Sequence, residues 1–168
     1  PKKAVINDYN EELMNVYKVL CDEEKFNKMA RVLNSHEANH NEEYYYEIRN
    51  KDRSKSSFAR LADYTRAART IYLNKACFNG LYRVNSKGFF NVPFNSAKNP
   101  LICDEENLRA CSCLLQNVKM TIGDYSQCKD FIDENTFVYI DPPYRPLTQT
   151  SAFTSYSEND FSDKEQIE

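Results

Sequence analysis

The residues Phe137-Val138-Tyr139-Ile140-Asp141-Pro142-Pro143-Tyr144 give the strongest indication of the fold in this sequence of 168 residues. Four apolar residues in a row predict a strand that is buried on both faces, as in a parallel sheet. The two prolines that follow the acid predict a stiff loop, because each fixes φ near about −65°. Parallel α/β sheets bind ligands beyond the carboxyl ends of their strands. The stretch therefore predicts an α/β fold with a site at Asp141.

Segments at both ends of the chain agree with an α/β fold. Residues 4–7 read as a short strand that ends at Asp8, and Asn10 is a good N-cap for a helix to about Cys21. Residues 105–115 predict a helix, and residues 118–122 predict a strand that runs into Gly123-Asp124-Tyr125. Strands and helices therefore alternate on both sides of a different middle part.

The middle of the chain is helical and basic. No Pro or Gly occurs from Asp22 to Asn74, and a helix is predicted to begin at Ser57. Turn sequences at 79–80 and 85–88 then predict a hairpin. Residues 49–100 hold eleven basic and two acidic residues, hence +9, which leaves −12 elsewhere in a chain of net charge −3. Such a block fits a phosphate backbone, and it fits a solvated basic helix face equally well.

Membrane and metal-binding classes are not predicted. No apolar run approaches the roughly 18 to 20 residues of a membrane span. His36 and His40 have the spacing of two ligands on one helix face, but no HExxH or CxxC arrangement accompanies them. We therefore expect neither a membrane partner nor a metal.

The loop after residue 140 offers hydrogen-bond acceptors beside an aromatic ring. The carboxylate of Asp141 and the carbonyl of Pro142 can each accept one hydrogen of an exocyclic amino group, while Tyr144 stacks on a planar base. Holding both hydrogens lets the nitrogen present its lone pair to an electrophile, which is catalysis by positioning. An ordinary rigid turn after a strand is the alternative interpretation.

Asp141-Pro142-Pro143-Tyr144 and several other stretches of the sequence resemble the Dam family of DNA adenine N6-methyltransferases. The resemblance rests on Asp-Pro-Pro-Tyr and on four further stretches in the family's order, which are residues 6–13, 77–85, 87–94 and 152–166. It implies a partial Rossmann-like methyltransferase domain with an inserted, mainly helical and hairpin-bearing target-recognition module. The implied boundaries are 1–21 and 101–168 for the methyltransferase domain and 22–100 for the insert.

The resemblance also implies the reaction and its catalytic and cofactor-binding residues. The cofactor is S-adenosyl-L-methionine, and the substrate is an adenine flipped out of double-stranded DNA, with GATC as the expected site. The implied catalytic residues are Asp141, Pro142 and Tyr144. The implied cofactor-binding residues are Asp8, Asp124, Tyr125 and Asp141. We expect a monomer in the cytoplasm of a bacterium, or a phage-encoded one, acting alone or beside a restriction enzyme.

The DNA-binding residues implied by the resemblance lie in the insert. Arg83 reads a guanine, and Leu81 and Pro93 make apolar contacts to the recognition bases. Phe78 and Asn79 fill the gap left by the adenine and meet its orphan thymine. Lys98 contacts the DNA backbone, and Ala97 stands where the family has a tyrosine.

Two other functions remain open at this stage. A non-catalytic DNA-binding fragment or remnant is one, because the family's Gly-rich cofactor loop has no counterpart before Gly80. On this ground we expect the chain to be a central part of such an enzyme, without the family's last strands. Alone, it should bind the cofactor poorly and be inactive. An N4-cytosine or RNA amino-methyltransferase is the other, and Leu81, Arg83 and Pro93 argue against it.

Overall fold

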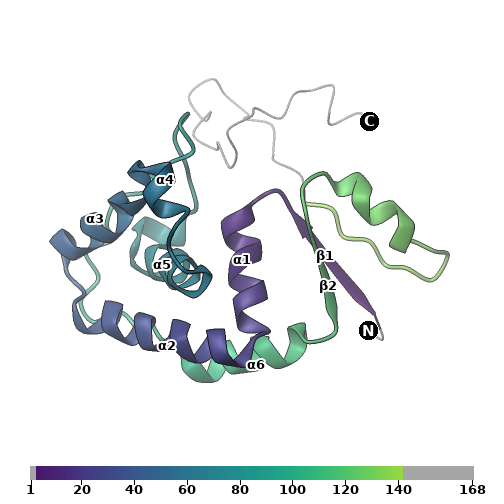
Figure 1. The fold of residues 1–168 in the computed structure, drawn as a ribbon, viewed down its shortest axis with the longest axis horizontal. Helices are drawn as coiled ribbons and strands as arrows, with labels where there is room; N and C mark the ends of the chain where they lie inside the picture. The colour runs from purple at the N-terminus through teal and green to yellow at the C-terminus, as the bar shows by residue number, and fades with distance from the viewer. Residues whose placement is uncertain (1–2, 142–168) are drawn as a thin grey trace.

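The fold is described from a computed structural model that covers residues 3–141. It joins a small parallel sheet to a larger group of helices (Figure 1). Strand β1 (Ala4–Asp8) pairs in parallel with β2 (Val118–Ile122), with Asp8 opposite Ile122. Both strands form where the sequence predicts them, and the mixed α/β character is confirmed. The strand residues of β1 are half-buried rather than fully buried.

The helices on both sides of the middle part form where the sequence predicts them, and the first begins at the predicted cap. Helix α1 (Glu11–Leu20) starts after Asn10, whose side chain accepts hydrogen bonds from the backbone of Glu12 and Leu13. Helix α6 (Glu105–Leu115) starts after Asp104 and has the bounds expected from the sequence. Acidic residues in the first turn of each helix are favoured by the helix dipole.

The middle of the chain forms several helices around α5 (Asp63–Ala76). Helix α5 packs on α1 and on α2 (Glu23–Ala38), and α3 (Glu42–Asn50) packs beside it. A 3-10 turn η1 (Lys51–Arg53) and the short helix α4 (Lys55–Phe58) connect α3 to α5. The core between these helices contains large side chains that are almost fully buried: Phe26, Met29, Leu33, Tyr45, Ile48, Tyr72 and Leu73.

The predicted helix from Ser57 onward is wrong in its start. Helix α4 ends at Phe58, and α5 begins only at Asp63, where an acid suits the positive end of the helix dipole. The intervening break lets Phe58 turn back onto α5, where the guanidinium of Arg69 lies 5.0 Å from the centre of its ring. Packing with α5 therefore decides this boundary, and the apolar spacing alone did not show it.

Residues 77–94 fold back on themselves after the 3-10 turn η2 (Phe78–Gly80). Isolated antiparallel bridges join Cys77 to Phe94 and Val84 to Phe90. Between them, Asn85 N donates to Phe89 O over 2.9 Å. The hairpin is therefore present, but its arms are joined by single bridges rather than by continuous strands.

The predicted strand at residues 137–140 is wrong for the described structure. After η3 (Tyr125–Phe131) these residues belong to no helix or strand and do not pair with β1 or β2. Phe137 is 89% exposed and Tyr139 is 77% exposed. A parallel strand needs a neighbouring strand for its hydrogen bonds, and the described two-stranded sheet does not supply one here.

Residues 3–141 contain no membrane-spanning or metal-binding feature. None of their helices combines the length and the apolar character that a membrane span requires. In the same part of the chain, no three His, Cys, Asp or Glu side chains converge as metal ligands would. His36 and His40 instead contact the core tyrosines Tyr44 and Tyr72.

Candidate functional site

The carboxyl ends of β1 and β2 bring two of the expected cofactor-binding acids to one edge of the sheet. Asp8 ends β1, and its Oδ1 accepts from the backbone of Asn10 over 2.7 Å. Asp124 follows β2 and accepts from Tyr9 Oη over 3.3 Å. Hydrogen bonds from Ser126 hold the pKa of the Asp124 carboxyl below its usual value. The register of the sheet thus joins residues that are far apart in sequence.

The same edge contains two buried polar atoms without a hydrogen-bond partner among residues 3–141. The amide of Asn7 donates to Gly123 O over 2.9 Å, but its Oδ1 is buried without a hydrogen bond among the described residues. Thr121 pairs with Asn7 in the sheet, and its buried Oγ1 likewise has no partner in residues 3–141. Such atoms cost free energy unless a ligand or water satisfies them.

The remaining expected residues at this edge are only partly described. Tyr125 begins η3 and is 51% exposed. Asp141 is exposed and is the last described residue. In Figure 1 the described chain ends near the end of the sheet at which the carboxyl ends of β1 and β2 lie. Pro142 and Tyr144 lie outside the described residues.

The expected DNA-binding residues lie on one continuous stretch, residues 78–98, which we call the hairpin segment. Phe78 N donates to Pro93 O over 2.8 Å, so the two ends of the hairpin meet. Phe78 is 50% exposed, Leu81 is 45% exposed, and Pro93 is also exposed. Asn79 adopts a left-handed φ of 54°, which asparagine tolerates better than most residues. Three apolar groups are thus presented to solvent from one folded unit.

Arg83 is held by its neighbour on the opposite arm of the hairpin. Its Nε donates to Asn91 Oδ1 over 2.7 Å, and its Nη2 donates to Asn91 O over 3.3 Å. Within residues 3–141, Nη1 makes no hydrogen bond, so the end of the guanidinium keeps donors for another partner. The guanidinium is therefore oriented before any ligand arrives.

The loop that carries Lys98 is fixed by a histidine from the helical core. The carbonyl of Ala97 lies 3.2 Å from Nε2 of His40, and a carbonyl can only accept, so Nε2 donates. In the neutral ring Nδ1 then accepts from the hydroxyl of Tyr72 over 3.1 Å. Lys98 itself is exposed beside this anchored position.

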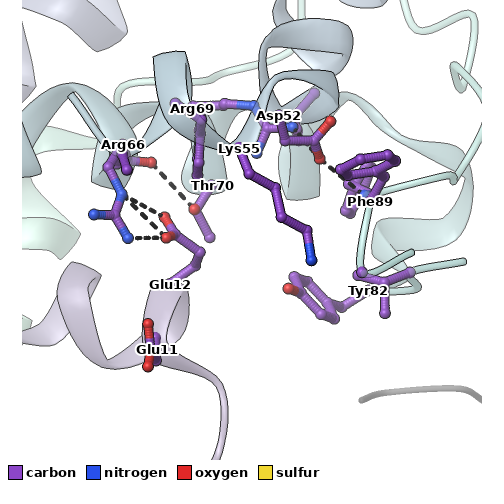
Figure 2. Close-up of a pocket in the computed structure, with 15 residues that line it drawn as sticks. Glu11, Glu12, Asp52, Lys55, Arg66, Arg69, Thr70, Tyr82 and Phe89 are labelled. Carbon is purple, nitrogen blue, oxygen red and sulfur yellow. Dashed lines mark hydrogen bonds and ion pairs between the residues drawn. The ribbon is translucent and has the colours of Figure 1, made fainter. Parts of the chain in front are cut away.

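A cavity of about 370 Å³ separates the start of α1 from the hairpin segment. Figure 2 shows Glu12 paired with Arg66 on one wall, and Lys55 and Tyr82 on the other. Tyr82 and Val84 line the cavity. Arg83 lies between them and does not line the cavity. Because side chains alternate along an extended chain, its side chain lies on the opposite face of the hairpin.

Four arginines of the basic block form ion pairs or hydrogen bonds within the protein. Arg66 pairs with Glu12, and Arg69 pairs with Asp52 over 2.8 Å. Arg49 and Arg53 donate to backbone carbonyls of the hairpin segment. The basic side chains of residues 49–100 that remain exposed are Lys51, Lys55, Arg60, Lys75, Lys87 and Lys98.

The role of Asp52 was not predicted from the sequence. This residue is 8% exposed, and its carboxylate accepts from Arg53, from Arg69 and from the backbone of Phe90. A signal was present, since Asp52 is one of two acids in the basic block and Arg69 lies within the apolar stripe of its helix. A buried arginine of this kind needs an acidic partner.

The whole chain matches one family of known proteins. Residues 1–168 match the family described as D12 class N6 adenine-specific DNA methyltransferase. The chain is 44% identical to the Type II methyltransferase M.MjaIII of Methanocaldococcus jannaschii and 42% identical to the Type II methyltransferase M1.LlaDCHI of Lactococcus lactis subsp. cremoris. Each match covers 99% of this chain and 58% of the relative. A DNA adenine methylase of Serratia marcescens is 33% identical over 94% of this chain and 56% of its own length.

Proposed function

Because the chain belongs to the D12 class of N6 adenine-specific DNA methyltransferases, we propose that its protein transfers a methyl group from S-adenosylmethionine to adenine N6 in duplex DNA, at GATC. In this proposal residues 1–21 and 101–168 belong to a Rossmann-like methyltransferase domain. Residues 22–100 are an inserted target-recognition module. Both parts contribute to one site.

The main support for the proposal is the geometry of the hairpin segment. It presents exposed apolar side chains at Phe78, Leu81 and Pro93 together with the oriented guanidinium of Arg83. Arginine donates to O6 and N7 of guanine in the major groove, and apolar side chains contact the methyl group of thymine. In this proposal Lys98, which follows the Ala97 carbonyl bound by His40, contacts a phosphate. This combination suits a DNA-reading surface.

Residues at the carboxyl edge of the sheet fit the nucleoside half of the cofactor. Asp8 offers a carboxylate at the end of β1, where ribose hydroxyls are commonly bound. The buried Asn7 Oδ1, which has no partner in the described part, is an acceptor for a further donor of such a ligand. Asp124 and Tyr125 would lie beside its base. S-adenosylmethionine held there would supply an electrophilic methyl group on its sulfonium, and its sulfur would keep the electron pair of the C–S bond.

The chain's own contribution to this reaction is to position the amino group. The carboxylate of Asp141 and the carbonyl of Pro142 each accept one amino hydrogen, and Tyr144 stacks on the adenine. The nitrogen lone pair is thereby directed at the methyl carbon, and the nitrogen then loses one proton to water. Positioning and electrostatic stabilisation of this kind account for much of the rate in many enzymes.

The proposal is tested by binding to paired DNA duplexes with the full-length protein. One duplex contains GATC, and in the other the guanine is replaced. Arg83→Ala should reduce discrimination between them by roughly 5- to 150-fold, the value of a bidentate contact to guanine. Arg31→Ala is the matched control, because Arg31 is exposed on α2, outside the hairpin segment. Unchanged discrimination in Arg83→Ala would refute the assignment of this hairpin as the DNA reader.

A further inference from the structure

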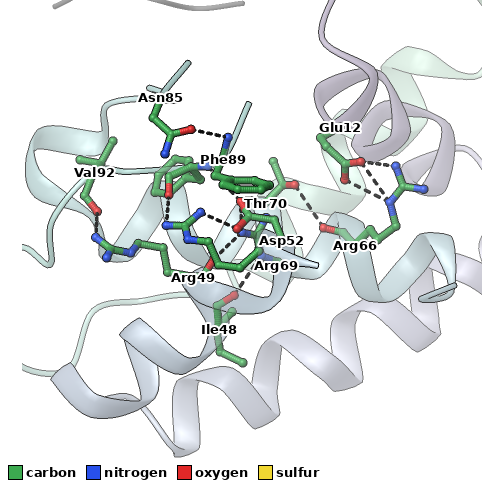
Figure 3. A network of polar contacts seen from close by, with 12 residues as sticks. Glu12, Ile48, Arg49, Asp52, Arg66, Arg69, Thr70, Asn85, Phe89 and Val92 are labelled. Carbon is green, nitrogen blue, oxygen red and sulfur yellow. Dashed lines mark hydrogen bonds and ion pairs between the residues drawn. The ribbon is translucent and has the colours of Figure 1, made fainter. Parts of the chain in front are cut away.

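The buried carboxylate of Asp52 lies at the centre of a clamp on the hairpin segment. Its Oδ2 accepts from Phe90 N over 2.9 Å and from Arg69 Nη2 over 2.8 Å. Its Oδ1 accepts from Arg53 Nη1 over 2.6 Å, and Arg53 Nη2 donates to Phe90 O over 2.8 Å. Both backbone groups of Phe90 are therefore held by side chains of the helical core. We call Asp52, Arg53 and Arg69 the Asp52 clamp, and Figure 3 labels Asp52 and Arg69.

The clamp is rigid because its other end is fixed in the helices. Arg69 is 5% exposed and also donates to the carbonyls of Ile48 and Arg49. Burial lowers the pKa of the Arg69 guanidinium, and the charge of Asp52 opposes this effect. A buried charge pair with its hydrogen bonds satisfied holds one geometry and tolerates the loss of neither partner.

The clamped residue is next to the residue that orients Arg83. Asn91 follows Phe90, and its side chain accepts from Arg83 Nε. Asn91 N also donates to Arg83 O over 3.0 Å, so backbone and side chain of the two residues are joined. A displacement of Phe90 would move Asn91 and, with it, the guanidinium of Arg83.

We propose that Asp52 is a positioning residue for DNA specificity, which acts by holding Phe90 and Asn91 so that the Arg83 guanidinium is oriented before it meets a base. This inference rests on the proposed function, in which Arg83 reads a guanine. Asp52 contacts no DNA in this arrangement, because it is buried beneath the hairpin. Its effect is on discrimination and not on general affinity for phosphate.

The test measures discrimination between the GATC duplex and the duplex with the guanine replaced, using the full-length protein. Asp52→Asn should reduce discrimination by about five- to tenfold, the effect of one ordinary hydrogen bond. Affinity for the replaced duplex should stay within about twofold. Glu105→Gln is the control, since it breaks an acid–arginine pair, the one with Arg109 on α6, that lies outside the Asp52 clamp and the hairpin segment.

A double-mutant cycle separates positioning from a general structural effect. In an Arg83→Ala background, Asp52→Asn should cause no further loss of discrimination. A loss that persists there, or unchanged discrimination in the single variant, would overturn the inference. If Arg83→Ala alone leaves discrimination unchanged, the proposed function fails, whatever Asp52 does.

A second variant keeps the test decisive if Asp52→Asn fails to fold. Arg53→Leu removes the contact to Phe90 O and leaves the buried pair of Asp52 and Arg69 in place. The Arg53 side chain is 32% exposed, so its loss is tolerated more easily. We expect about a threefold loss of discrimination and faster hydrogen exchange at the amide of Asn91. Faster exchange without any loss of discrimination would overturn the inference.

Discussion

The buried imidazole of His36 should make the protein less stable in mild acid. Its side chain is 5% exposed, and its Nδ1 lies 2.7 Å from the hydroxyl of Tyr44. Its Nε2 is buried without a hydrogen bond in the part of the chain described. Burial, together with the positive charge of Lys51, lowers the pKa of His36 from 6.5 to about 4.

The sign and size of the effect follow from the difference between the folded and unfolded states. Between these two pKa values the unfolded chain binds a proton at His36 and the folded chain does not, so stability falls as the pH falls. The contribution is complete above the unfolded pKa and is lost on the way to the folded pKa. One pKa unit corresponds to about 1.4 kcal/mol, so the loss from about pH 7.5 to about pH 5 is ~2 kcal/mol.

Urea unfolding of the wild type and of His36→Phe at these two pH values measures the effect. Phenylalanine does not titrate, and it keeps a ring against Tyr72, whose centroid lies 4.9 Å from that of His36. The variant should lose ~2 kcal/mol less than the wild type on acidification, whatever its stability at about pH 7.5. Equal losses in the two proteins would show that His36 does not cause the loss of stability, as would an imidazole of His36 that titrates at its ordinary pKa.

Two further predictions concern DNA binding and methyl transfer by the full-length protein. Lys98→Gln should reduce the slope of log affinity against log salt by about 0.9, the effect of one phosphate contact, and Lys28→Gln on α2 should not; equal slopes would place Lys98 off the DNA. Asp141→Ala should lower the rate of methyl transfer by about a hundredfold or more while leaving duplex affinity unchanged, and retained transfer in a radiolabelled-methyl assay would contradict the role given to its carboxylate.

Elements with local signals could be predicted from the sequence. The caps Asn10 and Asp104 and the acidic first turns after them are sufficient to place α1 and α6. The strands on either side were also located, because their short apolar runs end in turn residues. These signals depend only on neighbouring residues in the chain.

Features that depend on distant residues could not be predicted. Residues 137–140 are apolar enough for a buried strand, but strand formation needs a partner that apolar character alone does not reveal. The start of α5 depends on how Phe58 packs against it. Only the position of Arg69 within the apolar stripe of its helix indicated an internal partner; which acid pairs with which arginine depends on the positions of Glu12 and Asp52 in the fold.

The positions of the proposed DNA-reading residues were anticipated only in part. The resemblance placed Phe78, Leu81, Arg83 and Pro93 near one another in sequence. In the structure the amide of Phe78 donates to the carbonyl of Pro93, and the amide of Leu81 donates to the carbonyl of Phe78. The resemblance did not indicate that Asn91 orients Arg83 or that the helical core holds Phe90. Those contacts are specific to the folded hairpin segment and its supports.

The proposed methyl transfer to adenine in GATC is tested most directly by mapping methylated bases in duplex DNA treated with the full-length protein and S-adenosylmethionine. We predict N6-methyladenine in GATC and no methylation of the same adenine when the guanine is replaced. Methyl groups on cytosine, N6-methyladenine at unrelated sequences, or unmodified DNA would contradict the account.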